Sequence, residues 1–262
     1  MAFGDDPPPV TFLHGIKPDQ AIYRIFAEKY FLELLTKRMM TLARPETWDD
    51  PYENLIHQGS VLVDGSAVGL EPIRKSFYGQ SWTLKDESDA LWRIYSYDKK
   101  GVRIKTTVQK LANVLHNRTV QEGMPQHSFH KCFVGRVIYS DMSDMVALMA
   151  NSDERLHIIA DTSGRTSAQS LLFKRHAFSH EEEVRAIYNT VGEARKDTYG
   201  NYLHFETPDD FIEEICLDPR TIFEYEQNKQ RLVDLGATVP IKCSELYAPL
   251  SDALLWHHEN NP

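Results

Sequence analysis

The sequence predicts a single α+β domain built on one mixed sheet with peripheral helices. Short segments rich in β-branched and aromatic residues alternate with segments that have the 3.6-residue period of amphipathic helices. No repeat, low-complexity linker or shift in composition divides the 262 residues, a length that suits one large domain. We therefore expect a flexible N-terminal lead-in over residues 1–20, and one mixed α/β domain over residues 21–262.

The N-terminal part of this domain is predicted to run strand, helix, strand. Residues 21–26 have the composition of a strand, and residues 27–40 carry an apolar stripe at helical spacing that should pack on the sheet. Residues 40–43 follow as a second short strand. Two prolines and two adjacent aspartates then mark residues 44–53 as a rigid, irregular loop.

In the middle of the chain, strands and helices are predicted to alternate again after a surface loop. Residues 57–75 contain three glycines and no clear period, which is typical of a mobile surface loop. The expected strands are 77–84, 101–107 and 130–139, and the expected helices begin at Asp86 or Ser88, at Val108 and near Ser143.

The C-terminal part contains the clearest supersecondary unit. Residues 167–175 are predicted to be helical, with strands at 181–188 and 202–205. A strand at 212–217, a helix that ends before Gly236 and a strand at 239–243 then follow. A strand, helix and strand in this order favour a right-handed parallel crossover.

Charge and hydropathy exclude two classes of protein. A net charge of -9 and a pI near 5.7 argue against coating nucleic acid or an anionic membrane by bulk electrostatics, although they allow a local basic pocket. No apolar run approaches the length of a membrane span, and the N-terminus lacks a secretory signal. We expect a cytoplasmic protein with no membrane partner.

The cysteines indicate neither disulfides nor a metal site. Cys132, Cys216 and Cys243 are widely spaced in apolar segments, so we expect reduced thiols in the core. His127 and His130 precede Cys132, but their spacing matches no strong zinc pattern. The sequence therefore predicts no bound metal.

The charged run from His180 to Arg185 is the strongest candidate for a site. In an extended strand, Glu181, Glu183 and Arg185 would share one face and Glu182 would point to the other. Neighbouring carboxylates repel each other, so such a pair is either screened by water or kept for chemistry. The run alone allows a solvated strand edge as well as a functional site.

Several short motifs occur in order along the chain. They are Tyr23-Arg24, Trp48-Asp-Asp, Pro51-Tyr-Glu53, Ser81-Trp-Thr83, Leu91-Trp-x-x-Tyr95, Gly101-Val102 and Glu181-x-Glu183-Val-Arg185. Together they resemble a bacterial family of domains of unknown function, found around phage-defence and mobile-element genes. The resemblance covers about residues 21–247, and its most specific parts are the Pro-Tyr-Glu and Glu-x-Glu-Val-Arg motifs.

A second, weaker resemblance suggests a chemistry. An arginine on an early strand, a serine on a middle strand and Glu-x-Glu on a later one is the order found in the Arg-Ser-Glu class of ADP-ribosyltransferases. The matching residues here are Arg24, Ser81, Glu181 and Glu183. The chain departs from that class by having Ser-Trp-Thr where Ser-Thr-Ser is usual, and by placing Arg185 beside the acidic pair, which puts the role of Ser81 in doubt.

This resemblance implies an ADP-ribosyltransferase-like fold and a site that uses NAD as a substrate. Glu183 would be the catalytic residue that binds the ribose and stabilises its developing positive charge, and Glu181 would orient or deprotonate the acceptor. Arg24 would hold phosphate or ribose. The remaining candidates for NAD binding are Tyr23, Ser81, Trp82 and Tyr95. Tyr78 is a further aromatic that could stack on nicotinamide.

The implied function is a bacterial toxin or phage-defence effector that modifies a protein or nucleic-acid acceptor. An antitoxin or chaperone would be a natural partner. Ordinary structural roles compete with each assignment. Arg24 could pair with Glu28 four residues later, Trp82 and Tyr95 could belong to the core, and Arg185 could simply neutralise Glu183.

Two other functions remain open from the sequence. Asp49, Asp50 and Glu53, together with the Glu181 and Glu183 carboxylates, could bind Mg²⁺ in a nuclease of a defence system. The two aspartates could equally serve the turn before Pro51. The third possibility is a non-catalytic binding or immunity module, in which the acidic face recognises a basic partner.

Overall fold

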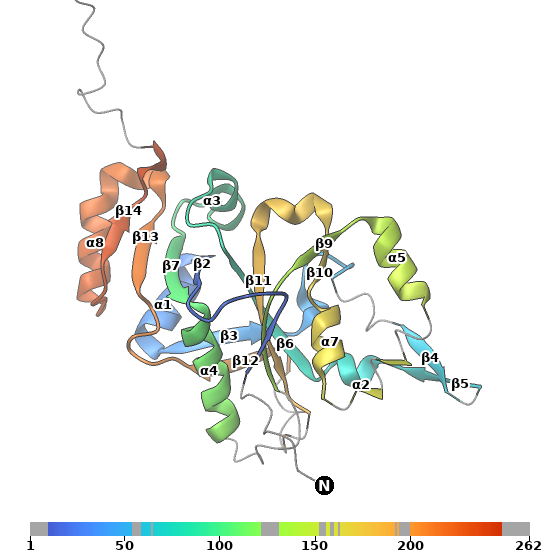
Figure 1. Ribbon diagram of the computed structural model, residues 1–262. Coiled ribbons are helices and arrows are strands. Elements are labelled where there is room, and N and C mark those ends of the chain that lie inside the picture. Colours follow the sequence, from blue (N-terminus) through green and yellow to red (C-terminus); the bar gives the residue numbers. More distant parts are fainter. Residues whose placement is uncertain are drawn as a thin grey trace, which may run out of the picture.

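The computed structural model describes residues 10–53, 59–63, 65–121, 131–151, 156–157, 160–161, 163–191, 193 and 200–247. Helices surround a large sheet in this part of the chain (Figure 1). Within it, no helix has the length and apolar character of a membrane span.

One mixed sheet forms the centre of the domain, as the sequence predicted. The strand order is β1-β8-β11-β6-β2-β7-β13-β14, and β3 joins β6 to β12. The pairs β1–β8 and β13–β14 are parallel and the remaining ladders antiparallel. The strands are β1 (Thr11–Leu13), β2 (Ala21–Phe26), β3 (Met39–Ala43), β6 (Phe77–Thr83), β7 (Val102–Thr107), β8 (Cys132–Arg136), β11 (Glu183–Asn189), β12 (Tyr202–Glu206), β13 (Glu214–Leu217) and β14 (Ile241–Cys243).

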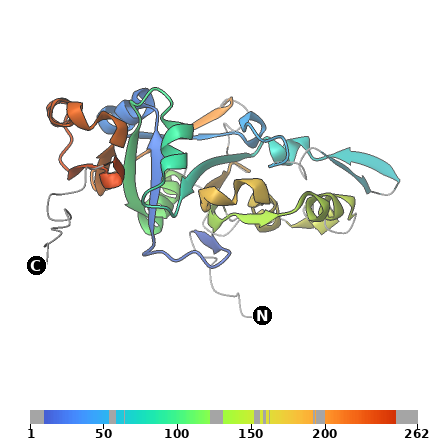
Figure 2. The ribbon, with the colours of Figure 1, turned by 90° about the horizontal axis from the view of Figure 1, so that it is seen from above.

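Helices, 3-10 turns and two small ladders lie around this sheet. The helices are α1 (Glu28–Lys37), α2 (Glu71–Arg74), α3 (Asp89–Tyr95), α4 (Val108–Gln121), α5 (Met142–Ala150), α7 (Arg165–Ser170) and α8 (Tyr225–Asp234). The 3-10 turns are η1 (Pro45–Thr47), η3 (His176–Glu181), η5 (Pro219–Glu224) and η6 (Glu245–Tyr247). The ladders pair β4 (Ser60–Val63) with β5 (Ser66–Gly69), and β9 (Ile138–Ser140) with β10 (Phe173–Arg175). Figure 2 shows the β4–β5 hairpin and α5 at one end and α8 at the other.

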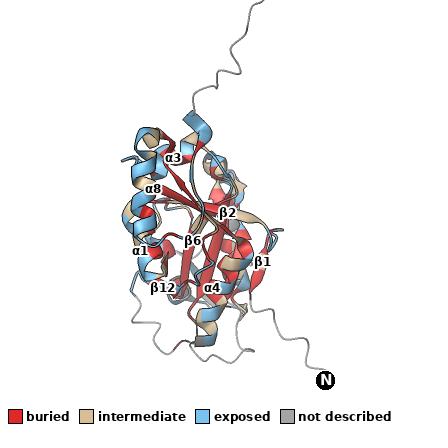
Figure 3. Ribbon diagram, turned by 90° about the vertical axis from the view of Figure 1, so that its left-hand side faces the viewer, coloured by how far each residue is buried: buried red, intermediate tan, exposed pale blue. Residues whose placement is uncertain are grey.

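The core lies where α1 and α4 press their apolar stripes onto the sheet. Phe31 and Leu34 of α1 and Leu111 and Leu115 of α4 are buried. All seven residues of β11 are buried as well, so both faces of this strand are covered. Figure 3 shows the buried strands enclosed by helices whose outer faces are exposed. A charged side chain on β11 therefore needs partners inside the protein.

The sheet divides along one edge of β6. The edge of β6 that faces β11 is continuous, because the two strands pair over seven residues. The opposite edge is the one that divides. On the dividing edge β2 pairs with β6 only at Tyr23 and Thr83, and β3 pairs only at Ala43 and Gly79. Because β2 and β3 meet opposite ends of β6, the strands separate between these two points.

The parallel unit predicted at the C-terminus is confirmed, since β13 and β14 are parallel neighbours separated in sequence by η5 and α8. The helix predicted to begin at Asp86 or Ser88 is also confirmed. Ser88 is the cap, because its hydroxyl accepts a hydrogen bond from the Leu91 amide at 3.4 Å. The three cysteines are free thiols, as predicted.

Other expectations about local structure are wrong. Residues 11–13 of the expected flexible lead-in form β1, because they pair with β8 in the sheet. The helix predicted over 167–175 ends at Ser170, because Phe173 to Arg175 pair with β9. Part of the expected loop 57–75 is the β4–β5 hairpin. His127 and His130 lie outside the described residues.

The strand predicted over residues 181–188 begins at Glu183 in the structure, two residues later than expected. Glu181 ends the η3 turn, and Glu182 adopts a left-handed conformation with φ of 42°. The strand therefore starts at Glu183, and Glu181 reaches its position from a turn rather than from the strand face.

Candidate active site

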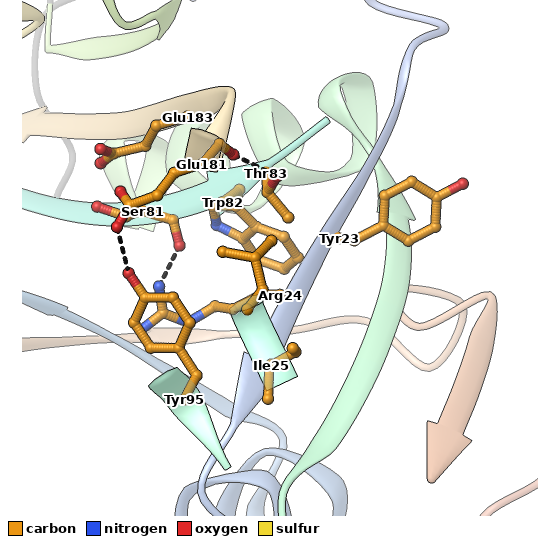
Figure 4. Close-up of a pocket in the computed structure, with 10 residues that line it drawn as sticks. Tyr23, Arg24, Ile25, Ser81, Trp82, Thr83, Tyr95, Glu181 and Glu183 are labelled. Atoms are coloured by element: carbon orange, nitrogen blue, oxygen red, sulfur yellow. Dashed lines mark hydrogen bonds between the residues drawn. The ribbon is translucent and has the colours of Figure 1, made fainter. Parts of the chain in front are cut away.

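A pocket opens where β2 and β6 separate. Its free volume is about 440 Å³ when the solvent at its open mouth is included, and its walls come from β2, β6, α3, the end of η3 and the start of β11 (Figure 4). It is lined by Tyr23, Arg24, Ile25, Ser81, Trp82, Thr83, Leu91, Tyr95, Glu181 and Glu183. The structure therefore brings together Glu181, Glu183, Arg24, Tyr23, Ser81, Trp82 and Tyr95, which the sequence proposed as catalytic or NAD-binding, but not Tyr78.

Arg24 extends from β2 across the gap between the strands. Its Nη1 donates a hydrogen bond to the Ser81 carbonyl, whereas its buried Nε has no hydrogen-bond partner among the described residues. Burial lowers the pKa of Arg24 to about 10, so the guanidinium stays charged at neutral pH. Glu28 pairs with Arg231 at 2.5 Å, so the alternative pairing of Arg24 with Glu28 is wrong.

Glu181 presents its carboxylate to the pocket between a phenol and an ammonium group. Its Oε1 accepts a hydrogen bond from the Tyr95 hydroxyl at 3.1 Å, and its Oε2 accepts one from Lys174 at 2.6 Å. The Thr83 hydroxyl fixes the turn by donating to the Glu181 carbonyl at 2.5 Å. Burial and the charge of Glu181 raise the pKa of Tyr95, so Tyr95 remains a hydrogen-bond donor.

Glu183 also lines the pocket (Figure 4), and both of its carboxylate oxygens contact cations of the protein. Arg185 Nε and Nη2 contact its two oxygens at 2.7 and 3.1 Å, and Lys174 Nζ lies 3.0 Å from Oε2. Burial raises the pKa of Glu183, but Arg185 and Lys174, with a smaller contribution from the Ser81 side chain, lower it to about 2. The carboxylate is therefore ionised, and Arg185 neutralises it as one sequence alternative proposed.

Lys174 and Glu53 complete the charge network. The sequence assigned no role to Lys174, whereas it grouped Glu53 with Glu181 and Glu183 as possible ligands of Mg²⁺. Lys174 Nζ contacts Glu53 at 3.0 Å in addition to Glu181 and Glu183, and Arg185 Nη2 contacts Glu53 at 3.1 Å. Burial raises the pKa of Glu53, an effect that its contacts with Arg185 and Lys174 oppose. The sequence contains one signal for such a network. Two carboxylates, Glu181 and Glu183, accompany a single cation, Arg185, and buried carboxylates need a cation each.

The aromatic candidates differ in how much surface they offer. Trp82 is 2% exposed and packs edge-on against Phe26 and Phe211, so it belongs to the core as well as to the pocket wall. The phenol of Tyr23 points away from the pocket centre (Figure 4) and lies against Arg103. Tyr95 is 45% exposed and is the aromatic side chain available to a ligand.

Tyr78 does not line the pocket. It is fully buried, and its hydroxyl donates a hydrogen bond to the Gly200 carbonyl at 2.8 Å. The suggestion that it could stack on nicotinamide is therefore wrong.

The carboxylates proposed for Mg²⁺ are engaged with cations of the protein. Asp50 accepts two hydrogen bonds from Arg175, both at 3.1 Å. Lys174 occupies the centre of the Glu53, Glu181 and Glu183 group. Over the residues that the structure describes, no three acidic, histidine or cysteine side chains are arranged to hold a metal ion. This arrangement disfavours the nuclease interpretation.

Residues 91–186 match a protein family described as being of unknown function, DUF2971. This range is shorter than the 21–247 over which the motifs suggested a resemblance. No curated protein matches the sequence.

Three structures of DarT from Thermus sp. 2.9 match the chain in a comparison of structures. The complex with ADP-ribosylated ssDNA is 11% identical, with a TM-score of 0.36, over 89% of this chain and 98% of that chain. For the NAD+ complex these values are 12%, 0.37, 88% and 98%, and for the carba-NAD+ complex 14%, 0.35, 87% and 96%. Similarity of this extent does not assign an activity to the chain.

Proposed function

We propose that the protein is an NAD-dependent ADP-ribosyltransferase, which cleaves the nicotinamide–ribose bond and transfers ADP-ribose to an acceptor. The observation that carries this proposal is that Arg24 and Glu181 line the same pocket. Arg24 has a buried Nε without a partner among the described residues, and Glu181 offers a carboxylate held by Tyr95 and Lys174.

The charges around the pocket suit a ligand that carries both signs. The three carboxylates of Glu53, Glu181 and Glu183 face the two cations Lys174 and Arg185, so one negative charge is in excess when all three are ionised. NAD has a positively charged nicotinamide ring and a negatively charged pyrophosphate. The excess charge would attract the ring, and Arg24 would bind the pyrophosphate or a ribose hydroxyl.

The reaction would use that excess charge directly. As the bond between ribose C1′ and the nicotinamide nitrogen breaks, nicotinamide leaves with the electron pair and positive charge develops on the ribose. A preorganised carboxylate stabilises this charge. The acceptor atom then forms the new bond to C1′, and its proton passes to a carboxylate of the site.

The geometry favours Glu181 as the carboxylate nearest the reacting ribose. Its side chain reaches the pocket beside Tyr95, whereas both oxygens of Glu183 are held by Arg185. Glu183 would then act behind Glu181 by holding Lys174. This reverses the relative importance that the sequence suggested for the two residues.

The acceptor is proposed only as a class, a protein or a nucleic acid. Because one of the similar structures is DarT in complex with ADP-ribosylated ssDNA, single-stranded DNA belongs in the acceptor panel. A role as a toxin or defence effector would appear as growth arrest when the protein is expressed in bacteria.

The test is to incubate the purified protein with NAD labelled in the adenylate group and with a cell extract or single-stranded DNA. We expect nicotinamide release and transfer of label. Glu181→Gln should lower release about a hundredfold or more, the size of effect seen when a transition-state charge loses its partner. Glu183→Gln should also lower it, with thermal unfolding used to separate catalysis from stability.

Glu182→Ala is the matched control, because Glu182 is exposed and pairs with Lys85 at 3.1 Å outside the network. It should retain wild-type release and stability. Absence of NAD binding by calorimetry would overturn the proposal. Mg²⁺-dependent cleavage of DNA or RNA would then support the nuclease, and a stable partner without catalysis would support the binding module.

A further inference from the structure

Lys174 joins three carboxylates that come from separate parts of the chain. Its Nζ lies 3.0 Å from Glu53, 2.6 Å from Glu181 and 3.0 Å from Glu183, and its side chain is 9% exposed. The three oxygens use the three protons of one ammonium group. The ring of Phe178 is 4.8 Å from the same nitrogen. Lys174 is therefore held in place from several directions.

Glu53 connects this ammonium group to the neighbouring guanidinium. One of its oxygens contacts Lys174, and the other contacts Arg185 Nη2 at 3.1 Å. The loop that carries Glu53 is itself attached nearby, because Asp50 accepts two hydrogen bonds from Arg175, the residue after Lys174. The Trp48-Asp-Asp-Pro-Tyr-Glu53 segment thus contacts two successive residues of β10, Lys174 through Glu53 and Arg175 through Asp50.

We propose that Lys174 is a positioning residue, which holds the Glu181 carboxylate at the pocket with Glu53 as its counter-ion. The proposal rests on the proposed function for its effect on catalysis, whereas the geometric part stands without it. Glu181 ends a 3-10 turn and precedes a left-handed residue, so the backbone offers it no strand to fix its direction. Its two side-chain contacts, Lys174 and Tyr95, supply that direction.

The nearby ion pair between Lys85 and Glu182 is an exposed one and serves as a comparison. Lys85 contacts Glu182 at 3.1 Å, with side chains that are 32% and 52% exposed. Such a pair contributes little, because water competes for both charges. Lys174 differs in burial, in the number of carboxylates and in its contact with a pocket residue. Lys85→Met is therefore the matched control for Lys174→Met.

The kinetic experiment compares Lys174→Met, Lys174→Arg and Lys85→Met for nicotinamide release. We expect Lys174→Met to lower kcat about tenfold to a hundredfold, the effect of losing a hydrogen bond to a charged group, with a much smaller change in KM for NAD. Lys174→Arg should recover part of this loss because a guanidinium can still bridge two carboxylates. Lys85→Met should match the wild type. Unchanged kcat in folded Lys174→Met would overturn the proposal.

The double variant Glu53→Gln/Lys174→Met separates position from net charge. It leaves two carboxylates and one cation, the same excess of one negative charge as three carboxylates and two cations in the wild type. If Lys174 acts by position, the double variant should be as slow as Lys174→Met. Recovery to near the wild-type rate would mean that only charge matters, and would overturn the proposal. The double variant also guards against misfolding, because it removes one charge of each sign.

A structural measurement tests the geometric part without any activity. Crystal structures of the wild type and of the double variant should show the Glu181 carboxylate at the pocket beside Tyr95 in the first and displaced in the second. An unmoved Glu181 would overturn the proposal even if NAD is the substrate. Conversely, displacement in a protein that releases no nicotinamide would retain the positioning role and reject the proposed function.

Discussion

Arg185 holds both oxygens of Glu183 from two residues away on the same strand. The distances are 2.7 Å from Nε to Oε1 and 3.1 Å from Nη2 to Oε2, and the Arg185 side chain is fully buried. Its Nη1 also donates to the Leu171 carbonyl at 2.5 Å. Arg185 therefore connects β11 to the segment that follows α7. We expect the Arg185–Glu183 pair to matter for stability as well as for the site.

Replacing Arg185 by methionine should strongly destabilise the fold. The change leaves Glu183 and Glu53 buried with Lys174 as their shared cation, and removing one partner of a buried ion pair costs about 3–5 kcal/mol. Urea unfolding measures this loss. Lys37→Met is the control, because Lys37 pairs with Glu33 at 3.3 Å on an exposed helix face and should change stability by less than about 0.5 kcal/mol. Similar losses in the two variants would contradict this role for Arg185.

Acid should weaken the protein through Glu183. The pKa of Glu183 is about 2 in the folded protein against an ordinary value of 4.5, because Arg185 and Lys174 outweigh the effect of burial. A depressed folded pKa means that the contribution of Glu183 to the free energy of unfolding is complete above about pH 4.5 and is lost as the pH falls toward about 2. Glu183→Gln should flatten the pH dependence in this window.

Urea unfolding at a series of pH values across that window provides the measurement. Glu182→Gln should keep the wild-type slope, since Glu182 is exposed and outside the network. If Glu183→Gln and the wild type lose stability in parallel, the low pKa of Glu183 is wrong.

Adding a methyl group at Gly79 should disturb the point where β3 meets β6. A Cβ there would lie 2.6 Å from Trp48 Cζ2. The Trp48 ring in turn packs against Arg185, whose Cζ lies 4.5 Å from the centre of the ring. Overpacking of this kind costs about 1–3 kcal/mol, so Gly79→Ala should lower the midpoint of thermal unfolding.

Gly69→Ala provides the matched comparison for Gly79→Ala. A Cβ at Gly69 would meet no atom within 4 Å, and the position does not have a positive φ. We expect a change of less than about 0.5 kcal/mol. A harmless Gly79→Ala would show that Trp48 can move freely.

The sequence predicted the candidate site better than its supporting network. The sequence proposes Arg24, Ser81, Glu181 and Glu183 as an ordered set, and the division of the sheet beside β6 places them around one pocket. Lys174 was missed because its segment has the local pattern of a helix. In the folded chain it joins β10, and β10 forms only through pairing with β9 far away in sequence.

The start of β11 illustrates the same limit. An alternating pattern predicts that Glu181 and Glu183 share a strand face, and no local signal requires a positive φ at Glu182. The Thr83 hydroxyl, which donates to the Glu181 carbonyl, and the Leu84 amide, which donates to the Glu182 carbonyl, stabilise the turn instead. These are contacts between segments that a single sequence does not reveal. The carboxylates nevertheless meet, because Lys174 draws them together.

Arg24→Ala should weaken NAD binding if the proposed function is right. The variant removes the guanidinium whose buried Nε has no partner among the described residues, and hydrogen bonds to a charged group account for about a tenfold to hundredfold change in affinity. Calorimetry measures the dissociation constant for NAD. Arg24→Lys should lie between the wild type and Arg24→Ala, because an ammonium keeps the charge but loses the planar pair of donors. Arg231→Ala, which breaks the half-exposed pair with Glu28, is the control and should bind NAD normally. Equal affinity in folded Arg24→Ala would show that the pyrophosphate lies elsewhere, and that Arg24 serves mainly to bridge β2 to the Ser81 carbonyl.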